Sequence, residues 1–315
     1  MRKISVVVCV FNEALNIKPL VESITLALSN IDYEIIYVDD GSTDNTAKEI
    51  LKLNHPYLTL VCFRKNYGQS SALAAGIKEA QGEFIVLLDG DLQNDPSDIP
   101  MMLDKAEKED WDMIAGFRKN RQDGMILRKI PSMIANSIIR RTTNVRFMDY
   151  GCTLKLFKSD LAKDLGLYGE LHRFIPVLAS LEGGRITQVE VKHHPRLHGT
   201  SKYGMGRTFK VMADLFLMLF IKKYMQSPMH LFGTWGILIL LIGIVINVYL
   251  LILKMLGNDI WGKPLLLLGV LFVITGFQLI TIGIFADTLM RTYYESQNKT
   301  PYKIKSIHYS ETRDK

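Results

Sequence analysis

Cysteine is scarce in this sequence, and its residues lie far apart. Cys9, Cys62 and Cys152 form no CxxC pair, which argues against a disulfide framework and against a structural zinc site. Reduced thiols in the cytosol are the simplest interpretation. The apolar run from Ile4 to Phe11 is too short for a secretory signal and lacks a small-residue cleavage site, so it predicts a first β-strand.

Charged residues are nearly absent from Leu231 to Leu289. Two stretches within it, 231–253 and 265–289, exceed the roughly 20 residues that a helix needs to cross a hydrocarbon core of about 30 Å. A buried core hairpin is the alternative, but helices of this length without a polar face are rarely buried in a chain of 315 residues. The sequence therefore predicts a pair of transmembrane helices over residues 231–290.

Basic residues flank both predicted spans. They are Arg207, Lys210, Lys222 and Lys223 before the first span, and Arg291, Lys299, Lys303 and Lys305 after the second. Because loops rich in Lys and Arg stay on the cytoplasmic side of a membrane, the folded domain and both termini are expected there. The expected location is the cytoplasmic (inner) membrane, with a multi-pass topology.

Acidic residues are missing from two basic intervals. Between Arg118 and Arg146 the sole acid is Asp123, and the segment from Lys192 to Lys210 has none. Phosphate groups of a ligand and anionic lipid headgroups are both suitable partners for such segments. The net charge of +6 is modest, and no nucleic acid partner is predicted.

Short apolar runs alternate with helical periods through about the first hundred residues, a pattern typical of βαβ units on a parallel sheet. The expected strands are Ile4–Val10, Tyr33–Val38, Leu58–Phe63, Phe84–Leu88 and Asp112–Ala115. The predicted fold class is α/β, with a mostly parallel sheet flanked by helices over residues 1–206. An interfacial amphipathic helical segment (207–230), the two-helix hairpin (231–290) and a cytoplasmic tail (291–315) are expected to follow.

Polar clusters follow three of the expected strands. They are Asn12-Glu13, Asp39-Asp40-Gly41-Ser42 and Asp89-Gly90-Asp91. Ligands of open α/β sheets bind at the carboxyl ends of the strands, so these clusters are expected to converge on one site. In the second cluster Asp39 is expected to face the ligand. A tight turn with Ser42 or Thr43 capping the next helix is the other interpretation, and both can hold at once.

Asp89 and Asp91 leave a strand end with one glycine between them, and Gln93 follows two residues later. Carboxylates at this spacing point the same way, and their oxygens are the hard ligands that Mg²⁺ and Mn²⁺ prefer. A DxD sequence alone occurs by chance in many solvated turns, and Gln93 makes the pattern more specific. The segment therefore predicts a divalent metal site, Mg²⁺ or Mn²⁺, completed by substrate phosphates.

Four short motifs together resemble glycosyltransferase family 2, in that family's order and at similar intervals. They are Val10–Glu13, Asp39–Asp44, Arg64–Gly68 and Asp89–Gln93. The resemblance implies a GT-A (Rossmann-like) fold, a nucleotide-diphosphate sugar as donor, and metal binding by Asp91 and Gln93. The donor-binding residues that it implies are Phe11, Asn12, Glu13, Asp39, Asp40, Arg64, Asn66, Gly68 and Asp89. Two positions depart from the family's usual pattern, because Gly90 replaces an alanine and Cys9 or Val10 replaces a proline.

Further motifs narrow the resemblance to the polyprenyl-phosphate branch of the family. They are Gly116–Asp123, Asp149–Cys152, His172–Pro176 and Ser201–Tyr203. The implied reaction is the inverting transfer of a UDP-linked sugar to a polyprenyl (undecaprenyl) phosphate at the cytoplasmic membrane face, for cell-envelope glycan or lipid A modification. An acceptor phosphate is already anionic near neutral pH and needs little help from a general base. Asp149 is the nearest candidate, and no base is assigned.

A lipid phosphate acceptor also accounts for the basic intervals. The predicted lipid-phosphate-binding residues are Arg118, Arg121, Arg128, Arg196 and Lys202. The predicted catalytic residues are Asp89, Asp91, Arg118 and Lys202. Attraction of the same cations to anionic headgroups is the simpler interpretation of the interval as a whole.

Two other functions stay open. A processive or glycan-acceptor enzyme of the same family usually carries a Gln-x-x-Arg-Trp motif, and no tryptophan of this sequence follows an arginine. A non-catalytic membrane scaffold gives no reason for the Asp89–Gln93 pattern, and the dinucleotide-binding motif Gly-x-Gly-x-x-Gly is absent from the sequence. The sequence does not decide whether the chain forms a homo-oligomer.

Overall fold

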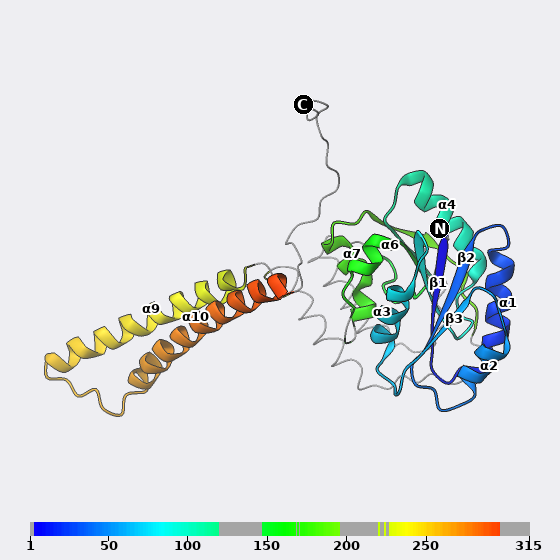
Figure 1. The fold of residues 1–315 in the computed structure, drawn as a ribbon. Coiled ribbons are helices and arrows are strands. Elements are labelled where there is room, and N and C mark those ends of the chain that lie inside the picture. Colours follow the sequence, from blue (N-terminus) through cyan, green and yellow to red (C-terminus); the bar gives the residue numbers. More distant parts are fainter. Residues whose placement is uncertain are drawn as a thin grey trace, which may run out of the picture. The chain divides into compact units, whose positions relative to one another are not determined.

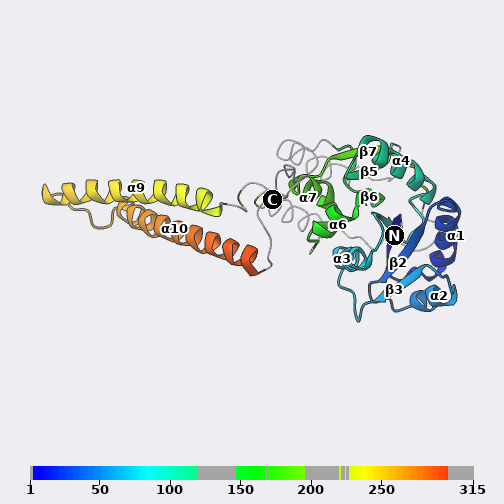
Figure 2. The same ribbon diagram turned by 45° about the horizontal axis from the view of Figure 1, so that its top comes forward.

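The computed structural model describes residues 3–119, 147–167, 169, 171–195, 220, 224 and 227–296. The chain forms two compact units, Met1–Met218 and Leu219–Lys315. The first, the sheet unit, contains a β-sheet covered by helices, and the second, the hairpin unit, contains two long helices (Figures 1 and 2).

A seven-stranded sheet in the order β3-β2-β1-β4-β6-β5-β7 forms the centre of the sheet unit. The strands are β1 (Ile4–Val10), β2 (Tyr33–Asp39), β3 (Leu58–Cys62), β4 (Phe84–Asp89), β5 (Met113–Phe117), β6 (Lys155–Lys158) and β7 (Ile186–Glu190). β6 runs antiparallel to its neighbours β4 and β5, and all other neighbouring strands are parallel. The predicted α/β class with a mostly parallel sheet is therefore confirmed.

Helices cover both faces of this sheet (Figure 1). They are α1 (Ile17–Ala27), α2 (Thr46–Lys52), α3 (Gln69–Glu79), α4 (Ile99–Glu109), α6 (Ser159–Asp164) and α7 (Ile175–Leu181), with short 3₁₀ turns η1 (Ala14–Asn16), η2 (Pro96–Asp98) and η3 (Leu171–Phe174). Because both faces are covered, β1, β2 and β4 are near-continuous apolar runs rather than alternating ones. Gly76 lets α3 approach β1 closely, since a Cβ atom there would lie 2.3 Å from Cγ1 of Val7.

All five expected strands are present, with boundaries that differ by a few residues. β2 and β4 each extend one residue further than expected, so that Asp39 and Asp89 are the last residues of their strands. Two strands, β6 and β7, are not among those expected from the sequence. The expected interfacial segment (207–230) lies almost entirely outside the described residues, and so does the tail from residue 297 onward.

The hairpin unit consists of α9 (Pro228–Met255) and α10 (Pro264–Ser296), which pack side by side (Figure 1). Glycines line their contact. A Cβ atom at Gly243 would lie 2.7 Å from the backbone N of Val273, and one at Gly276 would lie 2.6 Å from that of Leu240. Because these positions have no side chain, the two backbones come into direct contact, as in small-residue interfaces between membrane helices.

Most of the remaining surface of the hairpin is apolar and exposed. Only 17% and 11% of the most apolar parts of the two helices are buried, and both helices are long enough to cross a bilayer. Core helices of a soluble protein bury most of their surface, so this exposure indicates contact with lipid. The predicted two-helix membrane hairpin is confirmed.

Candidate active site

The predicted site residues gather where three parallel strands end at one edge of the sheet. β1 is the central strand of the three, and it pairs Val10 with Asp39 of β2 and Cys9 with Asp89 of β4. Side chains that follow these strands therefore leave the sheet at the same edge. The structure brings together the three polar clusters as the sequence predicts.

The loop after β1 is bonded to the loop after β2 through Asn12. The backbone N–H of Asn12 donates to Oγ of Ser42 at 2.8 Å, and its side-chain Oδ1 accepts from the backbone N–H of Thr43 at 2.8 Å. Asn12 has a left-handed backbone, with φ of 55°, which asparagine tolerates better than most residues. The side chain of Asn12 thus forms part of the wall of the site by joining two loops.

The turn after β2 contradicts the expected capping by Ser42 or Thr43. α2 begins at Thr46, and its cap residue Asn45 makes no side-chain capping bond. Oδ1 of Asp44 instead accepts from the backbone N–H of Thr46 at 2.9 Å. Oγ of Ser42 accepts the backbone N–H of Asn12 and does not cap the helix.

Asp39 and Asp40 have different surroundings. Both oxygens of Asp40 accept backbone N–H groups, from Tyr67 at 2.7 Å and from Gly68 at 2.9 Å. Oδ1 of Asp39 accepts from the backbone N–H of Ser42 at 3.0 Å, and Oδ2 has no donor among the residues that the structure describes. Asp40 therefore anchors the Arg64–Gly68 loop, whereas Asp39 keeps an oxygen for a ligand.

Gly41 explains why the Arg64–Gly68 loop can lie so close to the turn after β2. Its backbone is left-handed, with φ of 74°, and a Cβ atom there would lie 2.4 Å from the carbonyl carbon of Lys65. Any other residue would push the Arg64–Gly68 loop away. Within that loop Arg64 and Asn66 are exposed, and Phe11 on the neighbouring loop is partly buried.

Asp89 is held by two side chains that the sequence analysis missed. Nε2 of Gln69 donates to its Oδ1 at 2.8 Å, and Oγ1 of Thr153 donates to its Oδ2 at 2.5 Å. Burial raises the pKa of Asp89 to about 6, and the nearby charge of Asp91 adds to this effect. Gln69 directly follows the Arg64–Gly68 motif, which is the one sequence signal that could have identified it.

Asp91 is the better placed of the two carboxylates to bind a metal ion. It is buried, and its Oδ1 accepts the backbone N–H of Gln93 at 3.2 Å across Leu92, whose φ is 61°. Asp89 already uses both oxygens. The described residues contain no group of three or more His, Cys, Asp or Glu side chains that could enclose an ion, so a cation here requires further oxygens from a substrate.

Arg118 lies beside this edge in an ion pair with Asp149. Nε of Arg118 donates to Oδ2 of Asp149 at 2.6 Å and Nη2 donates to Oδ1 at 3.2 Å, while Nη1 lies 3.2 Å from Nε2 of His193. Both side chains of the ion pair are largely buried. A bidentate pair of this kind fixes the guanidinium plane, so the structure places Arg118 and Asp149 in one unit.

The segment after β7 joins this ion pair to the loop that carries Asp91. Asn94 and His193 form an isolated β-bridge, the backbone N–H of His194 donates to the carbonyl of Gln93 at 2.8 Å, and Nε2 of His194 lies 3.0 Å from Oδ2 of Asp95. The basic interval that begins at Lys192 therefore starts next to the predicted metal site. The sequence analysis assigned no such role to His193 or His194.

Lys155 is a further positive charge that the sequence analysis missed. It is 3% exposed, it pairs with Leu87 two residues before Asp89, and its Nζ donates to the carbonyl of Cys152. Burial lowers the pKa of Lys155, while Cys152, Asp149 and Asp89 act in the opposite direction. Its charge partly offsets that of Asp89.

Four predicted lipid-phosphate-binding residues lie outside the described residues. They are Arg121, Arg128, Arg196 and Lys202. For these positions the prediction stays as the sequence gives it.

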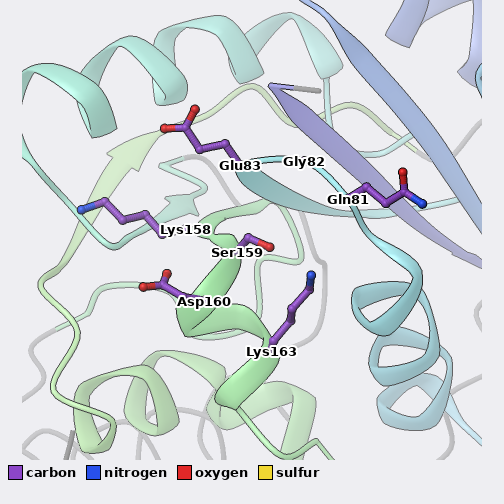
Figure 3. A pocket seen from close by; sticks show the side chains of 7 residues that line it. All are labelled: Gln81, Gly82, Glu83, Lys158, Ser159, Asp160 and Lys163. Carbon is purple, nitrogen blue, oxygen red and sulfur yellow. The ribbon is translucent and has the colours of Figure 1, made fainter. Parts of the chain in front are cut away.

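A separate pocket lies at the end of the sheet opposite to the candidate active site, where β4 begins and β6 ends (Figure 3). It is lined by residues just before β4 (Gln81, Gly82 and Glu83) and at or after the end of β6 (Lys158, Ser159, Asp160 and Lys163). Because Asp89 terminates β4 at its other end, this pocket does not belong to the candidate active site.

Comparisons with known proteins identify the family of this chain. Residues 5–166 match the family model Glycosyl transferase family 2. The chain is 42% identical over 313 residues to a dodecaprenyl-phosphate galacturonate synthase of Rhizobium johnstonii, covering 97% of this chain and 93% of the relative. It is 32% identical over 319 residues to an undecaprenyl-phosphate 4-deoxy-4-formamido-L-arabinose transferase of Salmonella choleraesuis, covering 99% of this chain and 95% of the relative.

Among solved structures, the fold is similar to that of glucosyl-3-phosphoglycerate synthase from Mycobacterium tuberculosis, crystallised with Mn²⁺, UDP and glucosyl-3-phosphoglycerate. The TM-score is 0.55 at 15% identity, covering 70% of this chain and 80% of that one. The sheet unit therefore has a fold of the GT-A type. The chain belongs to glycosyl transferase family 2, and its resemblance to the polyprenyl-phosphate branch is confirmed by both relatives.

Proposed function

We propose that this glycosyltransferase moves a sugar from a nucleoside diphosphate, UDP in the first instance, to a polyprenyl phosphate at the cytoplasmic face of the inner membrane. The observation that carries the proposal is that one chain combines a carboxylate pair at the sheet edge, Asp89 and Asp91, with a membrane hairpin. The names of the Rhizobium and Salmonella relatives support a polyprenyl-phosphate acceptor. The product would serve cell-envelope glycan or lipid A modification.

The donor would bind against the loops after β1, β2 and β4. Oδ2 of Asp39 is available to accept from a base N–H or a ribose hydroxyl, while Asn12 and Asp40 keep the surrounding loops in place. Asp89 is oriented by Gln69 and Thr153. The exposed Arg64 and Asn66 are proposed to contact the donor from the edge of this pocket.

The residues present fit a divalent cation, Mg²⁺ or Mn²⁺, held by Asp91 and Gln93 with substrate phosphates. Such an ion would neutralise the negative charge that develops on the departing β-phosphate oxygen. Two facing carboxylates repel each other when both are ionised, and the raised pKa of Asp89 reflects this repulsion together with burial. The neighbour from Mycobacterium tuberculosis, which contains Mn²⁺ and UDP, supports the same assignment.

The transfer itself needs one displacement. An oxygen of the acceptor phosphate attacks the anomeric carbon, the bond from that carbon to the β-phosphate oxygen breaks, and the nucleoside diphosphate leaves, so the configuration inverts. No proton has to be removed from an ionised phosphate. Arg118 and Lys202 are proposed to bind the acceptor phosphate, together with Arg121, Arg128 and Arg196.

The experiment is a transfer assay with the full-length protein in lipid nanodiscs, Mn²⁺ and a panel of UDP-sugars that includes UDP-galacturonate and UDP-4-deoxy-4-formamido-L-arabinose. Product is identified by mass spectrometry. We expect a glycosyl polyprenyl phosphate with undecaprenyl phosphate as acceptor and none with undecaprenol, which lacks the phosphate. Transfer to undecaprenol or to an oligosaccharide instead would show that the acceptor is wrong, and sugar release that persists in Asp91→Asn would show that the site is wrong.

A further inference from the structure

Gln278 lies near the middle of the apolar part of α10, which extends from Pro264 to Met290. Its side chain is exposed on the hairpin unit. An amide at this depth has no water available to it, and an unsatisfied polar group in hydrocarbon is unfavourable. The position of Gln278 therefore calls for a hydrogen-bonding partner.

Four other polar side chains of the hairpin bond to their own helix. The acceptor is the carbonyl four residues earlier for Thr234, Asn247, Thr281 and Thr288. The amide of Gln278 has no hydrogen bond to any residue that the structure describes. An amide also carries two donors and an acceptor, so one backbone carbonyl would not satisfy it.

α9 cannot supply the partner, because Gln278 points away from it. Gly276 and Gly283 face α9, where added Cβ atoms would lie 2.6 Å from the backbone N of Leu240 and 2.8 Å from Sδ of Met229. Gln278 follows Gly276 by two residues, about 200° around an α-helix. It is therefore on the opposite side of α10 from the glycine contact.

The face around Gln278 has the spacing of a helix-packing surface. Leu267, Leu271, Ile274, Gln278, Thr281 and Phe285 follow each other in steps of four and three residues. The four apolar members are exposed, from 50% at Ile274 to 75% at Leu267. Steps of four and three place one continuous stripe against a partner helix, and a single polar residue in such a stripe fixes its register.

We propose that this stripe packs against the same stripe on α10 of a second copy of the chain, with the two Gln278 amides bonded to each other. An amide is self-complementary, because its N–H group can donate to the oxygen of an identical amide while its own oxygen accepts in return. Both copies cross the membrane in the same direction, so a two-fold axis along the membrane normal, between the two α10 helices, places both Gln278 amides at the same depth. The pair then uses the oxygen and one N–H group of each amide, and the second N–H group can donate to a carbonyl of its own helix. This inference requires that the hairpin span a membrane and is independent of the sugar and the acceptor.

The first test is disulfide cross-linking of single-cysteine variants in native membranes. Cys9→Ser, Cys62→Ser and Cys152→Ala provide the background, into which Gln278→Cys is introduced. Leu241→Cys is the matched control, because Leu241 is 54% exposed near the middle of α9. We expect Gln278→Cys to form a cross-linked dimer at least ten-fold faster than Leu241→Cys. Equal rates, or cross-links to another protein alone, would overturn the proposal.

The second test measures the dimer affinity of the full chain by energy transfer between labelled copies in phosphatidylcholine vesicles. Gln278→Leu should weaken dimerisation about three- to thirty-fold, the range that interhelical polar bonds contribute in membranes. Leucine is favourable in a bilayer, so the hairpin itself should stay intact. Gln278→Asn should retain most of the affinity. If Gln278→Leu associates as tightly as wild type, the amide pair does not hold the copies together.

Discussion

The proposed donor side and the proposed acceptor side of the candidate active site are built in different ways. On the donor side, the loops after β1 and β2 are fixed by side chains that accept backbone N–H groups, as Asp40 does from Tyr67 and Gly68. On the proposed acceptor side, Arg118, Asp149 and His193 come from three distant segments, and Arg118 contacts both of the others. The donor side is thus organised by short motifs, whereas the acceptor side depends on the order of the strands.

Loss of the metal ligand should have the largest effect. Asp91→Asn preserves the shape and the acceptor for the N–H of Gln93 but removes the charge that would bind the cation, so transfer should fall at least about a hundred-fold. The melting temperature should stay within a few degrees of wild type. Asp104→Asn, on the exposed surface of α4, is the control. Activity of Asp91→Asn within a few-fold of wild type would contradict the assignment.

Substitution of Arg118, on the proposed acceptor side, should have the next largest effect on transfer. Arg118→Ala removes the proposed phosphate contact and the bidentate partner of the largely buried Asp149, so catalytic efficiency should fall about ten- to a hundred-fold. We expect the change in polyprenyl-phosphate saturation, measured separately from UDP-sugar binding, to be the greater one. Lys202→Ala should behave in the same way.

The two roles of Arg118 can be separated by a double-mutant cycle. Asp149→Ala and Arg118→Ala/Asp149→Ala should show coupling in stability, because the pair is bidentate and mostly shielded from water. The same cycle for the exposed pair of Arg185 and Asp110, with Arg185→Ala and Asp110→Ala, should show little coupling in stability. If only donor binding weakens in Arg118→Ala, this arginine serves the diphosphate and the acceptor site is elsewhere.

Breaking the donor side should cost stability as well as activity. Asp40→Ala leaves the N–H groups of Tyr67 and Gly68 without their acceptor, which should lower the free energy of unfolding by about 1–3 kcal/mol. UDP binding, measured by calorimetry, should weaken because the Arg64–Gly68 loop is released. Unchanged stability and unchanged UDP affinity together would show that the loop does not depend on Asp40.

Acid should affect the site through Asp89. Because its pKa is raised from 3.8 to about 6 in the folded protein, the folded state binds the proton more tightly than the unfolded state. The contribution of Asp89 to stability is therefore largest below about pH 4, falls as the pH rises through about 6, and is constant above that. Metal-dependent UDP binding needs the ionised form and should weaken below about pH 6. Asp89→Asn should remove this slope from the unfolding curve, and a slope that persists would contradict the assignment.

The smallest expected effect concerns the two departures from the family pattern, which are in contact. A Cβ atom at Gly90 would lie 2.5 Å from Cγ1 of Val10. Gly90→Ala should therefore destabilise the protein by about 1 kcal/mol through overpacking, and Val10→Ala in the same chain should relieve part of this cost. Val6→Ala, four residues earlier in β1, should add independently. Strict additivity with Val10→Ala would show that the two departures are unrelated.

Much of this architecture could be predicted from the sequence. The apolar runs of β1, β2 and β4 are long enough to mark buried strands, and Asp39 and Asp89 lie at their ends as expected. The hairpin follows from two long stretches without charge, because a bilayer requires length and apolarity and little else. Both signals are local, so they can be recognised in a single sequence without an alignment.

The tertiary structure alone decided which residues complete the site. Thr153 bonds Asp89 from 64 positions away, Arg118 meets His193 across 75 positions, and the buried Lys155 donates to the carbonyl of Cys152. Thr153 and Lys155 are brought to Asp89 because β6 pairs with β4 in the opposite direction, and Arg118 meets His193 because β5 and β7 pair in parallel. Nothing in the short segment Lys155–Lys158 predicts that placement, since strand order depends on the packing of the whole sheet and not on the composition of one strand. The sequence by itself determined the kind of enzyme and the donor motifs, whereas long-range strand pairing decided the charges that surround the reacting groups.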